Sequence, residues 1–152
     1  INFMHQKLII NTDGGARGNP GPAGVGVVIS DAHGKIISRL KKYLGEATNN
    51  QAEYQALILA LEQAKKIYPP SFPPLAKGGI KGGVELEIKM DSELIVKQMQ
   101  GKYKIKEPQL KIFAAEALRL LKNFHQVQFK HVPREQNKEA DRLVNQAIDE
   151  AL

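Results

Sequence analysis

Residues 7–22, KLIINTDGGARGNPGP, predict the first strand of the fold and give the first indication of a site. The apolar run at residues 8–10 is short, rich in β-branched side chains and followed by turn residues, which predicts a buried strand. We expect Asp13 to lie where this strand ends, with Gly14 and Gly15 allowing a ligand to approach the backbone closely. A carboxylate at that place is a candidate site residue. An Asp that ends the strand in an Asx turn is the alternative interpretation.

The composition is that of an ordinary globular chain. Of its 152 residues, 42% are hydrophobic and 25% are charged, so we expect one domain over residues 1–152. The chain has no cysteine, which excludes disulfides and thiolate metal sites and fits a cytoplasmic location. No apolar run approaches the roughly 20 residues that span a bilayer, so we expect no membrane partner. The N-terminus lacks a signal-peptide pattern, and residues 1–3, before Met4, are left out of the fold prediction.

The chain is basic, with a formal net charge of +6 and a pI near 9.5. Such a charge favours polyanionic partners, nucleic acids among them. Many small proteins are mildly basic for solubility alone. The charge therefore agrees with a nucleic-acid partner without identifying one.

Two further strands are predicted after the glycine-rich turn, at residues 23–30 and 34–44. A hairpin turn at residues 31–34 joins them, so the first three strands form an antiparallel meander. A helix follows, because Thr48, Asn49 and Asn50 form a helix N-cap cluster and apolar residues then recur at helical spacing as far as Ile67.

Glu53 is predicted to lie in the first turn of this helix, on its apolar stripe and facing the sheet. An acid in a first turn is ordinarily a favourable partner of the helix dipole. An inward-facing carboxylate is different, because its desolvation is costly unless it is paired or binds a metal. This argument favours a functional role for Glu53.

Residues 69–83, PPSFPPLAKGGIKGG, interrupt the pattern with four prolines and four glycines, and we interpret them as a flexible inserted loop. The next strand, residues 84–90, alternates apolar and charged side chains and is followed by Asp91, so a strand again ends in an acid. In the last predicted helix Asp141 lies on or beside the apolar stripe. The elements predicted after residue 91 are helices at 93–100 and 109–123, a strand at 126–132 and a helix at 137–151.

The predicted order of elements brings the acids together. Helical crossovers make the later strands parallel to the first, so Asp13 and Asp91 would end adjacent strands if the fourth strand pairs with the first. Glu53 and Asp141, each near a helix N-terminus, could close over that edge. Four carboxylates in one place repel each other unless cations neutralise them, and oxygen ligands alone select Mg²⁺ or Mn²⁺. Two such ions about 4 Å apart suit in-line displacement at phosphorus.

Four motifs resemble the ribonuclease H family, type 1 class. In chain order they are TDGGARGNPGPAG at 12–24, TNNQAEYQAL at 48–57, MDSELIV at 90–96 and HVPREQNKEADRLVNQA at 131–147. The resemblance implies an α/β ribonuclease H-like fold, with a five-stranded mixed sheet in the order 3-2-1-4-5 flanked by helices. It also implies endonucleolytic cleavage of the RNA strand of RNA/DNA hybrids, leaving 5′-phosphate and 3′-hydroxyl ends.

The same resemblance assigns roles to individual residues. The family's metal-binding acids fall on Asp13, Glu53, Asp91 and Asp141. The positions that contact the hybrid fall on Asn19, Asn49 and Asn50 near the minor groove, on Gly14 at the RNA backbone and on Thr48 at the DNA phosphates. Contacts with the 2′-hydroxyl would distinguish RNA from DNA.

Three departures from the family pattern affect the predicted site. The segment before the last acid is short, so we prefer Arg134 as the residue nearest the leaving group. His131 is the second candidate. The simpler interpretation is that His131 is a strand histidine whose ring nitrogens have their hydrogen bonds satisfied. The basic handle helix of some members is absent, and Lys102, Lys104 and Lys106 are the only nearby basic residues that could replace it. Glu93 stands where a neutral Gln is common.

The leading functional hypothesis is therefore a metal-dependent endoribonuclease that acts on RNA/DNA hybrids with two Mg²⁺ or Mn²⁺ ions. The alternatives are a non-catalytic nucleic-acid-binding module on the same fold and another nuclease or strand-transfer enzyme. The expected protein is a cytoplasmic monomer with no obligate protein partner.

Overall fold

The computed structural model describes residues 5–68 and 83–152. Residues 1–3 and most of the predicted 69–83 loop lie outside this part of the chain. Among the helices of the described part, none has the length and apolar composition needed to cross a membrane. The elements are β1 (His5–Ala16), β2 (Gly21–Asp31), β3 (Ile36–Ala47), α1 (Asn49–Ile67), β4 (Gly83–Met90), α2 (Glu93–Met99), α3 (Pro108–Leu121), β5 (Gln126–His131), the 3₁₀ turn η2 (Arg134–Gln136) and α4 (Lys138–Ala151).

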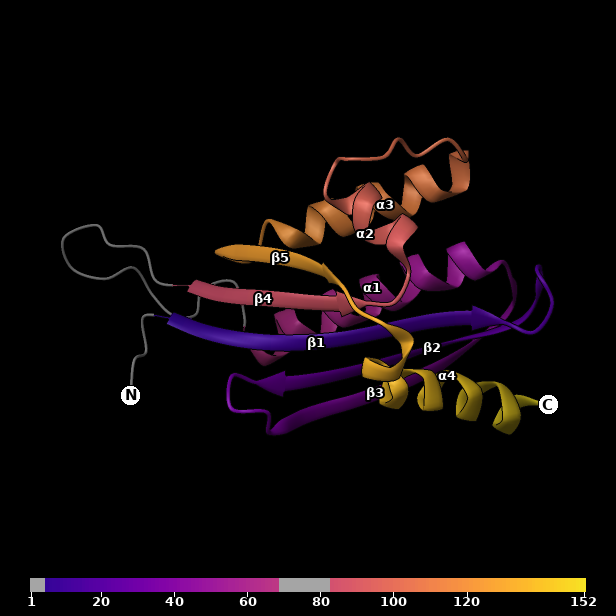
Figure 1. Ribbon diagram of the computed structural model, residues 1–152, viewed down its shortest axis with the longest axis horizontal. Helices are drawn as coiled ribbons and strands as arrows, with labels where there is room; N and C mark the ends of the chain where they lie inside the picture. Colours follow the sequence, from indigo (N-terminus) through magenta and orange to yellow (C-terminus); the bar gives the residue numbers. More distant parts are fainter. Residues whose placement is uncertain (1–4, 69–82) are drawn as a thin grey trace.

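The five strands form one mixed sheet in the order β3-β2-β1-β4-β5 (Figure 1). β1 pairs antiparallel with β2, and β2 pairs antiparallel with β3. β4 is parallel to both β1 and β5. The predicted strand order and the antiparallel meander are confirmed.

Helices cover the two faces of the sheet unequally. Successive residues of a strand point to opposite faces. Gly14 of β1 faces the backbone of α1, whereas Gly15, Gly24 and Gly26 face α4. α1 and α3 bury the main apolar core against one face, while α4 contacts β1, β2 and β3 on the other. The main core includes Leu8, Ile10, Val27, Ile29, Leu57, Leu61, Leu86 and Ile88.

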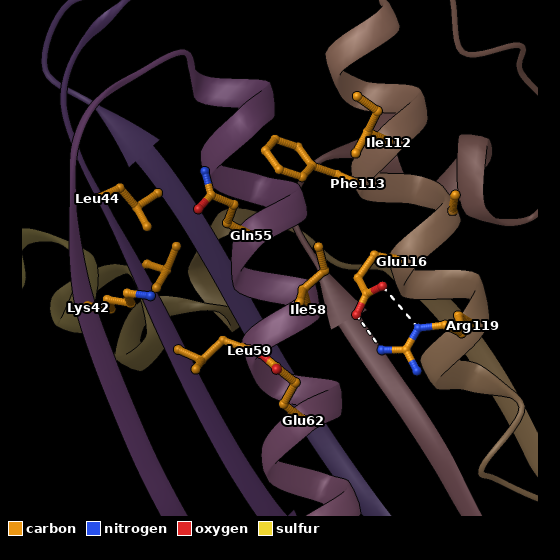
Figure 2. A pocket seen from close by; sticks show the side chains of 12 residues that line it. Lys42, Leu44, Gln55, Ile58, Leu59, Glu62, Ile112, Phe113, Glu116 and Arg119 are labelled. Atoms are coloured by element: carbon orange, nitrogen blue, oxygen red, sulfur yellow. Dashed lines mark hydrogen bonds and ion pairs between the residues drawn. The ribbon is translucent and has the colours of Figure 1, made fainter.

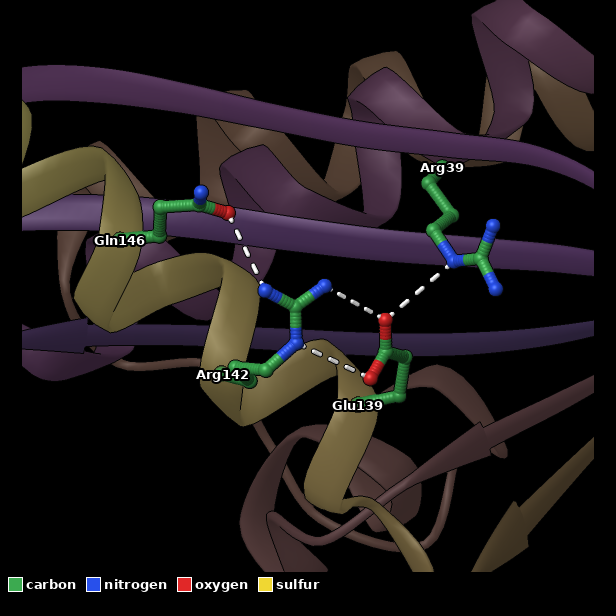
Figure 3. Close-up of polar contacts among 4 residues, drawn as sticks. All are labelled: Arg39, Glu139, Arg142 and Gln146. Carbon is green, nitrogen blue, oxygen red and sulfur yellow. Dashed lines mark hydrogen bonds and ion pairs between the residues drawn. The ribbon is translucent and has the colours of Figure 1, made fainter.

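α4 is held on its face by a close backbone contact and by exposed ion pairs. A Cβ atom at Gly26 would lie 2.2 Å from the carbonyl oxygen of Ala140, so only glycine allows the helix to pack this closely. Figure 3 shows Glu139 of α4 accepting hydrogen bonds from Arg39 of β3 at 3.2 Å and from Arg142 at 2.7 and 3.1 Å. Exposed pairs of this kind stabilise a fold by up to about 1 kcal/mol each. The glycine contact therefore determines how closely α4 packs against the sheet.

Several predicted boundaries are wrong for identifiable reasons. β1 continues through Asp13 to Ala16 because its antiparallel pairing with β2 continues to the same residue, so Asp13 lies within the strand and not at its end. α3 begins at Pro108, which occupies its first turn. Gly83 belongs to β4 and not to the insert, and a Cβ there would lie 2.5 Å from the Cβ of His125.

Candidate active site

Three acids meet at the end of the parallel β1–β4 pair. Asp13, Glu53 and Asp91 each contribute one carboxylate oxygen to a group whose atoms all lie within 4.8 Å of one another. Thr12 and Met90 are the last partners in the β1–β4 register, so the two aspartates follow side by side. Asp13 and Glu53 are each only 6% exposed. The structure therefore brings together three of the four predicted acids.

Glu53 reaches this group because α1 packs directly on β1. A Cβ atom at Gly14 would lie 2.3 Å from the Ala52 carbonyl group, and the Gly14 amide donates a hydrogen bond to Glu53 Oε1 at 3.1 Å. α1 begins at Asn49, after the Thr48–Gln51 capping box, so Glu53 lies in the second turn and not in the first. The missing side chain of Gly14 thus serves helix packing. Its contact with RNA stays a prediction.

Two of the grouped acids have pKa values raised above the usual range. Burial raises the pKa of Asp13 to about 7; the charges of Asp91 and Asp141 also raise it, while a hydrogen bond with Glu53 opposes the shift. Burial raises the pKa of Glu53 well above its usual value, and the charge of Asp13 adds to this effect. Both shifts show that the site disfavours its own negative charge.

A divalent cation fits this group of acids. Glu53 Oε2 is buried without a hydrogen-bond partner among the described residues, although its other oxygen accepts from Gly14. Buried oxygens of this kind need a proton, a donor or a metal. The ligand atoms are all carboxylate oxygens, the donor type that hard ions such as Mg²⁺ and Mn²⁺ prefer over zinc.

Asp141 occupies a different position from the other three acids. It lies in the first turn of α4, its side chain is 36% exposed, and it is outside the group within 4.8 Å. It nevertheless lines the same cleft, and its charge contributes to the raised pKa of Asp13. The predicted set of four acids thus consists of three that are grouped and one at the rim.

The acids line an open cleft of about 500 Å³. Polar groups predominate among its other lining residues, which include Gly14, Arg17, Asn49, Asn50, Ser92, His131, Arg134 and Asn145. Arg17, Ser92 and Asn145 were not predicted as site residues. The helical spacing of Asn145, four residues after Asp141, is a signal that could have indicated it; Arg17 carries no comparable signal.

Arg134 and His131 both reach the cleft. Arg134 is 79% exposed, and its Nη2 atom lies 3.9 Å from Asp141 Oδ1. His131, at the end of β5, is exposed and makes no side-chain hydrogen bond among the described residues. His131 is thus a strand residue with an exposed ring, and the interpretation that this ring is satisfied stays a prediction. Which of the two assists the reaction stays a prediction.

The predicted hybrid-contacting residues connect β1 to α1. The Asn49 amide donates to Asn19 Oδ1 at 3.0 Å, and the Ala16 amide donates to Asn49 Oδ1 at 2.8 Å. Thr48 caps the helix through its side chain. Asn49 and Asn50 line the cleft, whereas Asn19 and Thr48 are not among its lining residues.

A basic groove adjoins the cleft and shares Asn50 with it. This groove has a volume of about 480 Å³. Its lining includes Lys102, Tyr103, Lys104 and Lys106, which belong to the connection between α2 and α3. Lys97 stacks over the Tyr103 ring, with Nζ 5.1 Å from the ring centroid. It also pairs with Glu93 at 2.7 Å, so the acid that departs from the family pattern is neutralised.

Another cavity, of about 560 Å³, lies between α1, α3 and strands β2 and β3 (Figure 2). Its lining is largely apolar, with Ile58 and Leu59 from α1 and Ile112 and Phe113 from α3. None of the predicted site residues lines it. The four predicted acids are therefore in the polar cleft and not in this cavity.

Sequence comparisons agree with the site. A family model for RNase H matches residues 5–149. The bifunctional protein Rv2228c of Mycobacterium tuberculosis is 41% identical over 146 residues, which are 95% of this chain and 36% of that protein. Ribonuclease HI of Halobacterium salinarum is 40% identical over 139 residues, 91% of this chain and 63% of that protein. The chain thus spans less than two-thirds of the length of these curated relatives.

Solved structures show the same architecture. LC11-RNase H1 in complex with an RNA/DNA hybrid is 49% identical in sequence and has a TM-score of 0.84. The match covers 95% of this chain and 98% of that one. RNase H1 from Halobacterium salinarum is 37% identical, with a TM-score of 0.82 and the same two coverages.

Proposed function

This chain belongs to the ribonuclease H family, type 1 class, and from that premise we propose that it hydrolyses the RNA strand of RNA/DNA hybrids, leaving 5′-phosphate and 3′-hydroxyl ends. The observation that carries the proposal is the group of three acids within 4.8 Å at the floor of a polar cleft. A basic groove beside that cleft supplies the charge that a polyanionic substrate needs.

In this proposal Asp13, Glu53, Asp91 and Asp141 hold two Mg²⁺ or Mn²⁺ ions. When bound, the ions supply Lewis-acid polarisation of the phosphate and a lowered pKa for the attacking water. The cations would bind the ionised carboxylates, and so would counteract the burial that raises the pKa values of Asp13 and Glu53. The Gly14 amide donates to Glu53 Oε1. Glu53 Oε2 has no hydrogen-bond partner among the described residues and would be the oxygen that binds a cation.

The remaining residues of the cleft would bind and orient the hybrid. Gly14, Asn19, Thr48, Asn49 and Asn50 would contact it along the β1–α1 junction, and the basic groove would hold a phosphate backbone. Arg134 would lie near the leaving group, with His131 as the alternative. We further propose that residues 1–152 act as one cytoplasmic, monomeric domain, which gel filtration of the purified chain tests for oligomeric state.

A non-catalytic nucleic-acid-binding module on the same fold is the second candidate. The raised pKa values of Asp13 and Glu53 argue against it. A surface that only binds a polyanion gains nothing from buried acids that disfavour charge, because they contribute neither attraction nor stability.

Cleavage of labelled substrates tests the proposal. The purified chain with Mg²⁺ or Mn²⁺ is expected to cut the RNA of a hybrid, with duplex DNA, duplex RNA and single strands assayed alongside. Asp91→Asn is expected to abolish cutting. The matched control is Asp31→Asn, since Asp31 accepts two backbone hydrogen bonds in the β2–β3 turn and does not line the cleft. Hybrid binding without turnover, insensitive to Asp91→Asn, would favour the binding module.

A further inference from the structure

Asn137 connects the two parts of the site that come from different elements. It is 2% exposed and precedes α4 directly. We infer that Asn137 is a positioning residue that sets the placement of Asp141 relative to Asp13. The inference rests on the proposed function for its link to hydrolysis, but its structural content is independent of the substrate.

The side chain of Asn137 does not perform the usual task of an N-cap. An Asn in this position normally accepts a hydrogen bond from an amide in the first turn of its helix. Here no such bond forms. Instead Nδ2 donates to the carbonyl oxygen of Thr12 at 2.8 Å, and Oδ1 accepts from Asn11 Nδ2 at 3.1 Å. The residue thus gives up a local helix bond for two bonds to β1.

The backbone of Asn137 makes the complementary contacts. Its carbonyl oxygen accepts from the Asp141 amide at 3.1 Å, and its amide donates to the Arg134 carbonyl oxygen at 2.9 Å. Thr12 immediately precedes Asp13 and is the last residue of β1 that pairs with β4. One buried amide side chain therefore joins the backbone beside Asp13 to the turn that carries Asp141.

The packing of α4 explains why such a link matters. The contact of Ala140 with Gly26, which is the cross-strand partner of Asp13, fixes how closely the helix approaches the sheet. A close approach alone does not fix the position of the helix along its own axis. The bond from Asn137 to Thr12 supplies that second constraint. Asp141 lies outside the group of three acids, and its charge acts on Asp13.

Two variants test whether the donor of Asn137 positions the acids. Asn137→Ala removes both side-chain bonds. Asn137→Ser also loses both bonds, because its side chain is shorter, but it adds no charge and offers the helix an N-cap oxygen as favourable as that of Asn. Asn123→Ala is the matched control, because Asn123 Nδ2 likewise donates to a backbone carbonyl, that of Leu120, at 2.9 Å at the end of α3 and away from the cleft.

Each protein is assayed for thermal stability, for kcat and KM on a hybrid across Mg²⁺ concentrations, and for the rise in Tm that Mg²⁺ alone produces. Both Asn137 variants are expected to lower kcat, or raise the Mg²⁺ concentration for half-maximal rate, by about 10- to 100-fold, as outer-shell substitutions at metal sites do. The KM for the hybrid should stay within about threefold, since the proposed hybrid contacts lie elsewhere. Asn123→Ala is expected to lose stability with its Mg²⁺ dependence unchanged.

The inference is overturned if the Asn137 variants lose stability yet keep the Mg²⁺ dependence and kcat of the parent, as the control does. If Asn137→Ala does not fold, Asn137→Ser alone decides between the two results. If the parent chain cuts no hybrid, the proposed function fails on its own; a smaller Mg²⁺-induced rise in Tm in the Asn137 variants would still support the positioning role.

Discussion

Asp13 and Asp141 line one cleft, but the first is 6% exposed in the middle of β1 and the second is 36% exposed in the first turn of α4. Asp13, with Glu53 and Asp91, is held by backbone packing: the parallel register of β1 and β4, and the contact of α1 with Gly14. Asp141 in α4, Arg134 in η2 and His131 at the end of β5 come from three consecutive elements at the rim. The buried part of the site is electrostatically costly, whereas the rim depends on where one helix is placed.

The largest effect is expected for a substitution in the buried part. Asp13→Asn should reduce hybrid hydrolysis by about 1000-fold, or roughly 4 kcal/mol of transition-state stabilisation, because a ligand to the cations is lost. The same change should raise the Tm of the metal-free protein at pH 8, since it removes a buried like charge. Rate assays and thermal melts of the same preparation check both. A large loss of Tm together with the loss of rate would instead indicate that folding was damaged.

A smaller effect is expected at the rim. Asp141→Asn should lower kcat by about 10- to 100-fold, in the range found for groups that tune a metal site without dominating it. Its metal-free Tm should change little, because the side chain is partly exposed. A Mg²⁺ titration of the rate, run beside Asp13→Asn, measures the contrast. Equal losses of rate and equal gains of Tm for the two variants would remove the distinction between the buried and rim acids.

A still smaller effect is expected for the exposed candidates. Arg134 is mostly exposed and 3.9 Å from Asp141, so Arg134→Ala should cost at most about 1 kcal/mol, or about fivefold in rate. His131→Ala provides the comparison. If His131→Ala has the larger effect on kcat, the preference for Arg134 is wrong.

A further effect is expected in the metal-free protein, whose stability should depend on pH. The pKa of Asp13 is raised from 3.8 to about 7, so between these values the folded state holds a proton that the unfolded state has lost. The free energy of unfolding should therefore fall as pH rises through this window. Each 1 kcal/mol should lower Tm by about 2–4 °C.

Melts from pH 4 to pH 8 in a chelating buffer check this slope. Asp13→Asn should flatten it, and Mg²⁺ should oppose it because the ionised acids bind the cation. A metal-free Tm that rises steadily between pH 4 and pH 7 in a way that depends on Asp13 would contradict the raised pKa.

How far the sequence allowed prediction differs between these regions. The strand order was implied by the resemblance to the ribonuclease H family. Parallel crossovers indicated that Asp13 and Asp91 would share an edge if the fourth strand pairs with the first, and helical periodicity turned Glu53 toward the sheet. The continuation of β1 past Asp13 could not, because it depends on pairing with β2. The rim position of Asp141 follows from the placement of α4, which no local pattern encodes.

Asn137 shows a second limit. As a residue before a helix it is typical of an N-cap, and nothing local indicates that its side chain turns to Thr12 instead. The basic groove was predicted only in part: three lysines suggested a substitute for the handle, but the stacking of Lys97 on Tyr103 depends on how an irregular connection folds.

The central claim is that the buried acids hold the cations that hydrolyse RNA in a hybrid. The most direct measurement is the initial rate of RNA cleavage in a labelled RNA/DNA hybrid with Mg²⁺, for the parent chain and for Glu53→Gln, each with its melt recorded. We expect cleavage by the parent and none by a folded Glu53→Gln. Cleavage by Glu53→Gln at the parent rate, or none by the parent with Mg²⁺ or Mn²⁺, would contradict it.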